Sequence, residues 1–586
     1  MIQQRIEQLR ALMKQNDITA YLVGSNDFHL SEYVCDYFKG RQYLSGFTGS
    51  AGVLVVTADI AGLWTDGRYF LQAEQELAQT PIQLFRSGEK DVPTIECFLE
   101  QTLQPKDVLA FDGRTISQQQ AQQLHKKLDP CGIQFRTDID LLDTIWKDRP
   151  SLPANPTFCL SEEYTGQRAQ DKILKIRQSM AQSNAQIYLI TALDEIAWLL
   201  NIRGADIAYT PVVLAYCIVT AKQVFLFSNP QNYSEAVLAQ LQKYGAHLRD
   251  YDQIYPYLKT IKNQKILVDL KSANCAIIEA VQVQNSIIDQ NLIEKDKAIK
   301  NPTECDQIRK AHLKDGIACT CFIHWLKTHV ASEKITEISA AEKLDSFRKA
   351  QPDYLYQSFA PILAYGPHGA IVHYEASAQS NAMLRPENFL LVDTGGHYLQ
   401  GTTDITRTIA LGPLTEQQKQ DYTYVLKANL ALTAAVFKQK TTGKMLDCLA
   451  REELWRQGLD YNHGTGHGVG YLLNVHESGV GFGAQTVFEP GMLTSDEPGL
   501  YRNGQYGIRL ENLMLCQEDR TTSFGDFLHF ETVTLCPFER EAILPNLLSP
   551  QEKSTLNEYH DRVYQTLSTY LDKPAAQWLK QQTQEI

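Results

Sequence analysis

At roughly 150 residues per domain, a chain of 586 residues is long enough for about three or four domains, which excludes a single small module. Its 44% hydrophobic and 21% charged residues are ordinary for a globular protein and exclude a disordered or fibrous chain. The 55 Lys and Arg residues against 68 Asp and Glu leave a formal net charge of −13, which argues against a nucleic-acid binder held by phosphate contacts.

The first residues and the cysteines indicate where the protein works. Residues 1–18 place apolar side chains at helical intervals between charges, so they predict an amphipathic helix and not a secretory signal. The most apolar stretches, such as residues 53–57 and 211–220, fall short of the ~18 residues that a membrane helix needs, so we expect no membrane span. The 12 cysteines are scattered without a CxxC pair, as free thiols in a reducing compartment are. We therefore expect a cytoplasmic protein.

The first half of the chain contains an approximate internal repeat. Each copy predicts a strand, a helix and a second strand, followed by another apolar run, helical stretches and a further strand. The matched segments are residues 19–27, 43–47 and 52–57 in the first copy and residues 186–194, 198–202 and 213–220 in the second. We interpret the two copies as related α/β domains.

Two short segments predict the domain boundaries. Residues 148–156 hold three prolines in a polar stretch, which disfavours both a helix and a central strand. Residues 299–303 precede a long helical pattern that begins at Glu304. We therefore predict three domains, which comprise residues 1–150, 151–299 and 300–586.

The first of two predicted hairpins in the last domain carries two aspartates. The apolar strand of residues 389–393 ends in Asp393, and Asp404 lies on a returning segment across a turn at residues 398–401. Both aspartates are about equally far from the middle of that hairpin, so we expect them to face each other directly across the strands. Two bare carboxylates in that position would repel each other, which indicates a cation between them.

The second hairpin repeats the arrangement with glutamates. Glu497 and Glu511 are symmetric about Gly504, and the dipeptide Asn503-Gly504 predicts a type I′ turn. The two hairpins together offer four carboxylates, whose charge would balance that of two divalent cations.

A glycine-rich loop, His463-Gly-Thr-Gly-His467-Gly-Val-Gly470, lies between the two hairpins. Its alternate glycines let the backbone approach closely, as around a metal-bound imidazole. It is not a phosphate-binding loop, because no Lys-Ser or Lys-Thr follows the glycines, and the chain has no HExxH zinc-protease helix. Each feature alone is more often a solvated edge or a tight turn, but the set in this order predicts a dimetal site. Its oxygen-rich ligands suit manganese or a similar hard ion better than a tetrahedral zinc site would.

Several motifs of the last domain, together with residues 43–52 and 64–71 near the start, form a specific set. They are Leu391-Val-Asp393, Gly401-Thr-Thr-Asp-Ile-Thr-Arg-Thr408, the loop of residues 463–470, Asp496-Glu-Pro-Gly499 and Gly507-Ile-Arg-Leu-Glu-Asn512. This set resembles the pita-bread metallopeptidases and, more narrowly, the three-domain aminopeptidase P (Xaa-Pro aminopeptidase) family. The resemblance implies an α/β (α+β) fold, with creatinase-like N-terminal domains at residues 1–150 and 151–299. A pita-bread catalytic domain with a C-terminal helical extension would then occupy residues 300–586.

The family resemblance also implies a ligand set for two divalent metal ions, with manganese expected and zinc or cobalt as alternatives. Matched residue by residue, the metal ligands fall on Asp393, Asp404, His467, Glu497 and Glu511. Asp404 and Glu511 are expected to bridge the two ions, and Glu497 is expected to accept a proton as well. Arg509 resembles an arginine that orients an acidic ligand.

Three histidines match family positions near the substrate, namely His373, His463 and His476. Imidazoles beside a dimetal centre can donate to a developing oxyanion and relay protons to the leaving amine. Val475 and Tyr501 resemble the wall that accepts the proline ring. We therefore expect His373 and His476 to contact the substrate together with this wall.

The activity implied by the resemblance is release of the N-terminal residue from peptides with proline in second position. The family also implies a homodimer, and we expect neither a nucleic-acid nor a membrane partner. The first alternative is a prolidase, which cleaves Xaa-Pro dipeptides with the same ligands, although the familiar prolidases have a single N-terminal domain. The second is a non-catalytic pita-bread protein that binds a peptide or protein, although such relatives typically lose metal ligands.

Overall fold

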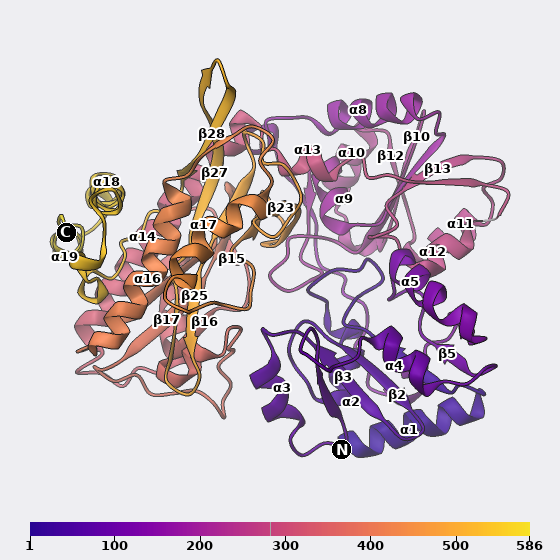
Figure 1. Cartoon of the computed structure of the whole chain (residues 1–586). Coiled ribbons are helices and arrows are strands. Elements are labelled where there is room, and N and C mark those ends of the chain that lie inside the picture. The colour runs from indigo at the N-terminus through magenta and orange to yellow at the C-terminus, as the bar shows by residue number, and fades with distance from the viewer. Residues whose placement is uncertain (282) are drawn as a thin grey trace. The chain divides into compact units, whose positions relative to one another are not determined.

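The computed structural model describes residues 1–281 and 283–586, which form two compact units (Figure 1). The first unit comprises residues 1–160 and 167–293, and the second comprises residues 161–166 and 294–586. No helix in the described part of the chain is both long and apolar enough to cross a membrane.

The first unit begins with a six-stranded sheet in the order β4-β3-β2-β1-β5-β6. Strand β2 pairs antiparallel with both β1 and β3. The pairs β3–β4, β1–β5 and β5–β6 are parallel. The strands are β1 (Ala20–Val23), β2 (Val53–Thr57), β3 (Ala61–Thr65), β4 (Gln83–Arg86), β5 (Val108–Ala110) and β6 (Gln134–Arg136). One face packs on α1 (Ile2–Gln15), α2 (Gly40–Ser45), α3 (Phe70–Leu77) and α6 (Leu142–Ile145). The other face packs on α4 (Ile95–Thr102) and α5 (Gln118–Leu128).

A second six-stranded sheet in the same unit repeats this topology. Its order, β12-β11-β10-β8-β13-β14, has antiparallel and parallel pairs at the same places as the first sheet. The strands are β8 (Ile187–Ile190), β10 (Ala215–Thr220), β11 (Val224–Ser228), β12 (Ala246–Arg249), β13 (Lys265–Val268) and β14 (Ser286–Asp289). The helices are α8 (Ala169–Gln182), α9 (Leu193–Leu200), α10 (Glu235–Lys243), α11 (Ile254–Leu258) and α12 (Cys275–Ala280). The internal repeat read from the sequence is thus present as two sheets of the same design.

The second unit contains the long helices and the candidate site. Helix α14 (Pro302–His329) begins with a capping box in which Asn301 and Glu304 bond each other's backbone N–H groups. Helix α15 (Glu337–Lys349) follows and packs with α14 on strands β16 (Ile362–Tyr365), β17 (Phe389–Thr394) and β20 (Ile405–Ala410). The three strands form one sheet in the order β16-β17-β20.

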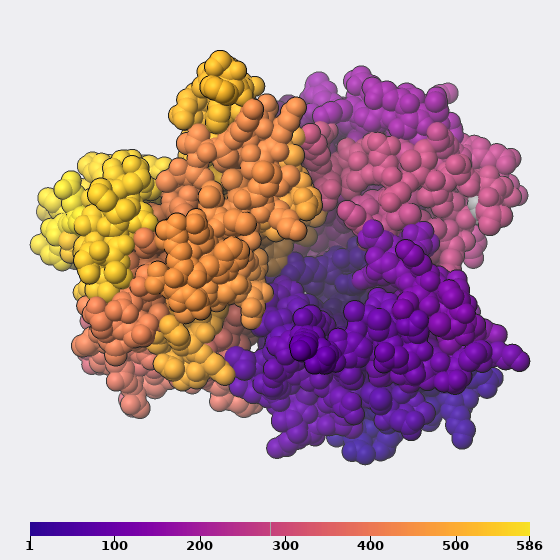
Figure 2. All heavy atoms as spheres, viewed as in Figure 1, coloured from indigo at the N-terminus to yellow at the C-terminus, as the bar shows by residue number. Residues whose placement is uncertain are grey.

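A second sheet of this unit has the order β21-β28-β27-β24-β22-β23. Its strands are β21 (Val436–Lys438), β22 (His467–Gly468), β23 (Glu477–Gly481), β24 (Leu493–Asp496), β27 (Asn512–Thr522) and β28 (Gly525–Thr532). Helix α17 (Gly443–Trp455) packs on it, while the end of the β27–β28 hairpin stands out from the surface (Figure 2).

Shorter sheets and the last helices complete the second unit. A small sheet joins β15 (Tyr354–Gln357), β18 (Gly396–Tyr398) and β19 (Gly401–Thr402). Strands β25 (Gly499–Arg502) and β26 (Tyr506–Arg509) form a hairpin that packs against α16 (Glu416–Thr433). The C-terminal helices α18 (Pro550–Leu567) and α19 (Lys573–Gln582) close the same core.

Candidate metal centre and active site

The aspartate hairpin has a different register from the one expected. Thr406, and not Asp404, lies opposite Asp393, because Tyr398 pairs with Gly401 and Asp393 lies five residues before this turn, whereas Asp404 lies only three residues after it. The expectation that the two aspartates face each other directly is therefore wrong. Side chains alternate along a strand, so Asp404, two residues before Thr406, still belongs to the side on which Asp393 lies.

The glutamate hairpin has the expected register but a different turn. Gly499 pairs with Arg509 and Asp496 with Asn512, which sets Glu497 opposite Glu511 as predicted. The prediction of a type I′ turn is wrong, because the loop has three residues, 503–505, between paired Arg502 and Tyr506. Of the two residues that a type I′ turn needs at positive φ, Gly504 alone adopts it, at +69°.

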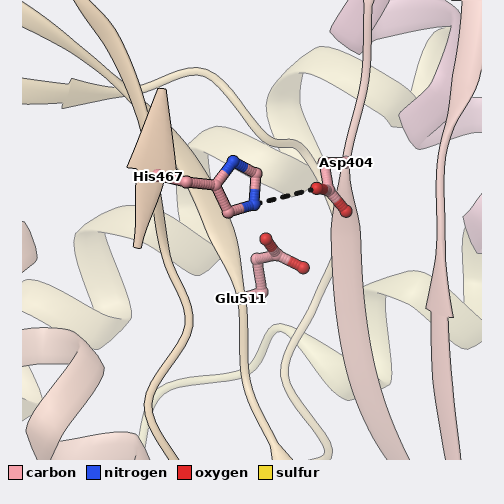
Figure 3. A group of neighbouring side chains, drawn as sticks. All are labelled: Asp404, His467 and Glu511. Atoms are coloured by element: carbon pink, nitrogen blue, oxygen red, sulfur yellow. Dashed lines mark ion pairs between the residues drawn. The ribbon is translucent and has the colours of Figure 1, made fainter. Parts of the chain in front are cut away.

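Asp404, His467 and Glu511 lie together where the β16-β17-β20 sheet meets the six-stranded sheet that contains β22 and β27 (Figure 3). One ligand atom from each residue can be chosen so that all three lie within 4.8 Å of one another. The His467 Nε2 atom is 3.5 Å from Asp404 Oδ2 and 3.4 Å from Glu497 Oε1. His467 Nδ1 lies 2.9 Å from the Gly468 carbonyl, which can only accept, so Nδ1 carries the proton. In the neutral ring, the Nε2 lone pair then points at the carboxylates, as a metal ligand requires.

The buried carboxylates of Asp393, Asp404 and Glu511 each have one oxygen near a polar side chain and one oxygen without a hydrogen-bond partner. Asp393 Oδ2 accepts from Arg509 Nη2 at 2.5 Å, and Glu511 Oε2 accepts from the Thr406 hydroxyl at 2.8 Å. The buried atoms Asp393 Oδ1, Asp404 Oδ1 and Glu511 Oε1 have no such partner. Burying a carboxylate oxygen without a partner is costly, so these atoms fit a bound cation.

The electrostatics of this cluster also favour cations. Burial, reinforced by the charges of Asp393 and Glu497, holds the pKa of Asp404 well above its usual range. Burial and the Asp404 charge do the same to the pKa of Glu511. Burial raises the pKa of Glu497 to about 7, although Arg509 opposes the shift. The metal-free cluster therefore retains protons that a bound metal ion would displace.

We expect metal affinity to fall steeply as the pH drops below about 7, because protons compete for Glu497 and its neighbours. Each proton released on binding changes the affinity about tenfold per pH unit. Calorimetric manganese titrations in buffers of different ionisation enthalpy will measure this release. Metal affinity that does not change between pH 6 and 8 would contradict the assignment of these carboxylates.

Carboxylic acids with raised folded-state pKa values stabilise the protein below their unfolded pKa, and this stability is lost as the pH rises through the folded value. The metal-free protein should therefore lose stability between about pH 4.5 and 7. The rise in melting temperature on adding manganese should accordingly be larger at pH 8 than at pH 5.5.

Ring contacts and hydrogen bonds place the predicted histidines His476 and His463. The ring of His476 lies edge-on to that of His467, with centroids 4.3 Å apart. His463 Nε2 is 2.8 Å from the Tyr501 hydroxyl, and its Nδ1 is 2.7 Å from the Gly464 carbonyl. His373 follows Val372, whose carbonyl accepts from Arg509 Nη1 at 3.3 Å. Val475 precedes His476 and is buried, and its part in a proline-binding wall stays a prediction.

Tyr501 was expected only as part of the wall that accepts the proline ring, but its hydroxyl also links His463 to Arg509. It accepts from Arg509 Nη1 at 2.8 Å, and burial raises the pKa of Tyr501 to about 12, so it keeps its proton. Since His463 Nδ1 donates to a carbonyl, the Tyr501 proton is directed to His463 Nε2. A continuous set of hydrogen bonds thus runs from His463 through Tyr501 and Arg509 to Asp393.

Two residues that hold the candidate ligands were missed in the sequence. Thr406 bonds Glu511, and the Ser495 hydroxyl bonds Glu497 Oε1 at 3.2 Å. Both lie two residues from an acidic ligand along the chain, so the period of a strand was the signal that could have identified them.

Four family models match the chain, in order. The Creatinase/Prolidase N-terminal domain matches twice, at residues 5–149 and 148–304. Metallopeptidase family M24 matches residues 306–518, and the C-terminal region of peptidase M24 matches residues 526–586.

Curated relatives match the chain over its whole length. A probable Xaa-Pro aminopeptidase P of Laccaria bicolor is 39% identical, over 99% of this chain and 93% of the relative. The Xaa-Pro aminopeptidase 1 of Dictyostelium discoideum is 36% identical, over 100% of this chain and 97% of the relative. The chain belongs to the Xaa-Pro aminopeptidase family. The predicted family and the prediction of a metal-dependent aminopeptidase are confirmed by these matches.

Solved structures agree with membership of the Xaa-Pro aminopeptidase family. The X-prolyl aminopeptidase of Caenorhabditis elegans, described as a cytosolic enzyme with a di-nuclear active site, is 32% identical, with a TM-score of 0.96 and full coverage of both chains. The predicted fold class is thereby confirmed. An Xaa-Pro dipeptidase from Bacillus anthracis is 25% identical, with a TM-score of 0.50, and covers 64% of this chain and 99% of its own. The Caenorhabditis elegans aminopeptidase matches the whole chain, including both N-terminal domains, whereas the dipeptidase matches only 64% of it. This difference agrees with the preference for an aminopeptidase over a prolidase.

Proposed function

We propose that this aminopeptidase releases the N-terminal residue from peptides with proline in second position, with two divalent cations at its active site. The ligands we propose are the carboxylates and imidazole of Asp393, Asp404, His467, Glu497 and Glu511. The observation that carries this proposal is the set of buried carboxylate oxygens without hydrogen-bond partners on Asp393, Asp404 and Glu511, two of which belong to the group that Asp404 and Glu511 form with His467. The di-nuclear site described for the Caenorhabditis elegans enzyme supports the number of ions.

The side chains of the site have distinct proposed tasks. When bound, the cations supply an activated water and polarise the scissile carbonyl. Glu497, beside His467, is the proposed proton acceptor. His476 and His373 stabilise the charge that develops on the carbonyl oxygen, and His463 is oriented by the Tyr501 hydroxyl.

Manganese, a cytoplasmic location and a homodimer are part of the same proposal. Oxygen-rich ligands favour manganese, with zinc or cobalt as alternatives. The cytosolic location described for the Caenorhabditis elegans enzyme supports the location. We also propose domain limits near residues 150 and 299, which the two creatinase-type matches, at residues 5–149 and 148–304, support.

The experiment that tests the activity compares three substrates on manganese-loaded protein. A tripeptide Xaa-Pro-Xaa should lose its first residue, whereas an Xaa-Pro dipeptide and an Xaa-Ala-Xaa tripeptide should not be cleaved. Cleavage confined to the dipeptide would instead identify a prolidase. If no peptide is cleaved although metal is bound, the chain is a binding protein of this fold.

The exposed face of helix α17 supports the proposed homodimer. Met445, Leu449 and Trp455 expose 64%, 38% and 50% of their surfaces, and exposed Cys448 lies among them. At 100° per residue these positions fall within an arc of about 120° on the helix. The exposed ion pair of Glu452 and Arg456 lies within the same arc, so this face combines apolar side chains with a charged pair, and a second copy can cover it symmetrically.

The change Leu449→Arg should convert the dimer to a monomer, because it places a charge beside Met445 and Cys448 on that face. Light scattering coupled to size-exclusion chromatography measures the mass. Leu174→Arg is the matched control, because Leu174 is a leucine with 56% exposure on α8, outside this face. A Leu449→Arg protein that keeps the dimer mass would exclude the α17 face as the interface.

A further inference from the structure

The carboxylate of Glu337 is fully buried at the first residue of α15 and accepts four hydrogen bonds. Oε1 accepts from the backbone N–H of Tyr365 and from Nδ1 of His368, each at 2.8 Å. Oε2 accepts from the hydroxyl of Tyr374 and from the backbone N–H of Ala382, also at 2.8 Å. Both oxygens are thus fully used, which makes Glu337 unlike the carboxylates of the metal cluster.

All four donors belong to residues 365–382, which run from the last residue of β16 into the segment before β17. Two of the donors are side chains, and they support each other, because the rings of His368 and Tyr374 stack with centroids 4.4 Å apart. The segment contains His373, which directly precedes Tyr374. Glu337 therefore anchors the loop that carries a proposed catalytic histidine.

The same loop is also held by the β25–β26 hairpin, through Arg509 and Gly507. The carbonyl of Val372 accepts from Arg509 Nη1 at 3.3 Å. The backbones of Gly369 and Gly507 are in direct contact, since a Cβ atom on Gly507 would lie 1.7 Å from the Gly369 oxygen. His373 is therefore flanked by two anchored neighbours, with Val372 held by Arg509 and Tyr374 held by Glu337.

The chemistry of Glu337 fits this task better than simple packing does. A buried carboxylate is expensive, and apolar residues of similar volume usually fill such a place at least as well. Four hydrogen bonds, two of them from backbone N–H groups 28 and 45 residues away, define the position of a loop in a way that apolar contacts cannot. The place of the carboxylate in the first turn of α15 also stabilises its charge.

We propose that Glu337 is a positioning residue for His373, which holds residues 365–382 so that the imidazole reaches the reacting peptide. This inference rests on the proposed function, because His373 acts there on the substrate. In the described part of the chain, the hydrogen bonds of the Glu337 carboxylate go to this segment and not to the proposed metal ligands.

The change Glu337→Gln tests this role. Glutamine has the same shape but keeps a single acceptor oxygen, so two of the four donors face an NH2 group. We expect kcat for an Xaa-Pro-Xaa tripeptide to fall about 10- to 100-fold, with two manganese ions still bound and KM changed less than about twofold. Glu342→Gln is the matched control, because Glu342 is an exposed glutamate of the same helix, and it should keep wild-type kinetics.

A double-mutant cycle with His373→Ala separates positioning from a general loss of structure. If Glu337 acts through His373, adding Glu337→Gln to His373→Ala should lower kcat less than about twofold further. If the full loss persists in the double mutant, or if Glu337→Gln alone keeps wild-type kcat, the proposal is wrong. If Glu337→Gln does not fold, Tyr374→Phe removes one of the four hydrogen bonds and is tested in the same cycle.

Failure of the proposed function has a different signature. In that case, the wild-type protein loaded with manganese does not cleave the Xaa-Pro-Xaa tripeptide, or His373→Ala cleaves it at the wild-type rate. Failure of the positioning role alone leaves wild-type cleavage and the His373→Ala defect in place.

Discussion

The change Asp404→Asn is expected to lower kcat/KM for an Xaa-Pro-Xaa tripeptide about a thousandfold or more. Asp404 is a proposed bridging ligand, and a neutral amide removes the charge that holds two cations together. Metal ions contribute several kcal/mol to transition-state stabilisation in such sites, and each 1.36 kcal/mol corresponds to a tenfold change in rate. Single-turnover hydrolysis at saturating manganese measures the loss without a contribution from weak metal loading.

The same substitution should stabilise the metal-free protein at high pH. Burial and the charges of Asp393 and Glu497 raise the pKa of Asp404, so wild type loses stability as the pH rises through that value. Asparagine does not titrate, so metal-free Asp404→Asn should melt a few degrees above wild type at pH 8 and near it at pH 5. Asp561→Asn on the exposed side of α18 is the matched control and should change neither property. Full activity of Asp404→Asn would refute the dimetal site.

The change Arg509→Met should act on stability in the opposite direction. Arg509 is buried, and its guanidinium lies 2.5 Å from Asp393 Oδ2 and bonds the Tyr501 hydroxyl. Breaking a buried ion pair by removing one partner typically costs about 3–5 kcal/mol, because the remaining charge is uncompensated. We therefore expect the free energy of unfolding of the metal-free protein to fall by about that amount, as denaturant titration will measure.

The activity of Arg509→Met should fall about 10- to 100-fold even with manganese bound, because Asp393 and Tyr501 lose the group that orients them. Manganese should recover part of the lost stability, since it supplies positive charge to the same carboxylates. Arg520→Met is the matched control, because Arg520 is an exposed arginine of β27. Unfolding of Arg509→Met at the same denaturant concentration as wild type would show that the ion pair does not hold Asp393 in the way we describe.

The pairing of Glu497 with Glu511 could be predicted from the sequence, because the register of a hairpin follows from the spacing of residues on either side of its turn. Glu497 and Glu511 are equally spaced from Gly504, and the observed register sets them opposite each other even though the turn is not type I′. The aspartate hairpin shows the limit of this reasoning. The turn lies at residues 398–401 as predicted, but Thr406, and not Asp404, is as far from it as Asp393 is, so the approximate symmetry of the two aspartates did not give the register.

Other parts of the site depend on contacts between distant segments and left no pattern in the sequence. Glu337 bonds groups 28 to 45 residues away, and nothing in the α15 sequence separates it from an ordinary first-turn glutamate. Tyr501 and His463 are 38 residues apart, and their hydrogen bond depends on how the β25–β26 hairpin packs. The duplicated sheets were easier to predict, because strand–helix–strand periodicity is local and occurs twice.

Titration of metal-free protein with manganese, followed by hydrolysis of an Xaa-Pro-Xaa tripeptide, tests the central claim of a two-metal Xaa-Pro aminopeptidase most directly. We predict no hydrolysis before metal is added and full activity when two manganese ions are bound per chain, with an Xaa-Ala-Xaa tripeptide uncleaved throughout. Hydrolysis that persists without metal, or two bound manganese ions without cleavage of the Xaa-Pro-Xaa tripeptide, would contradict it.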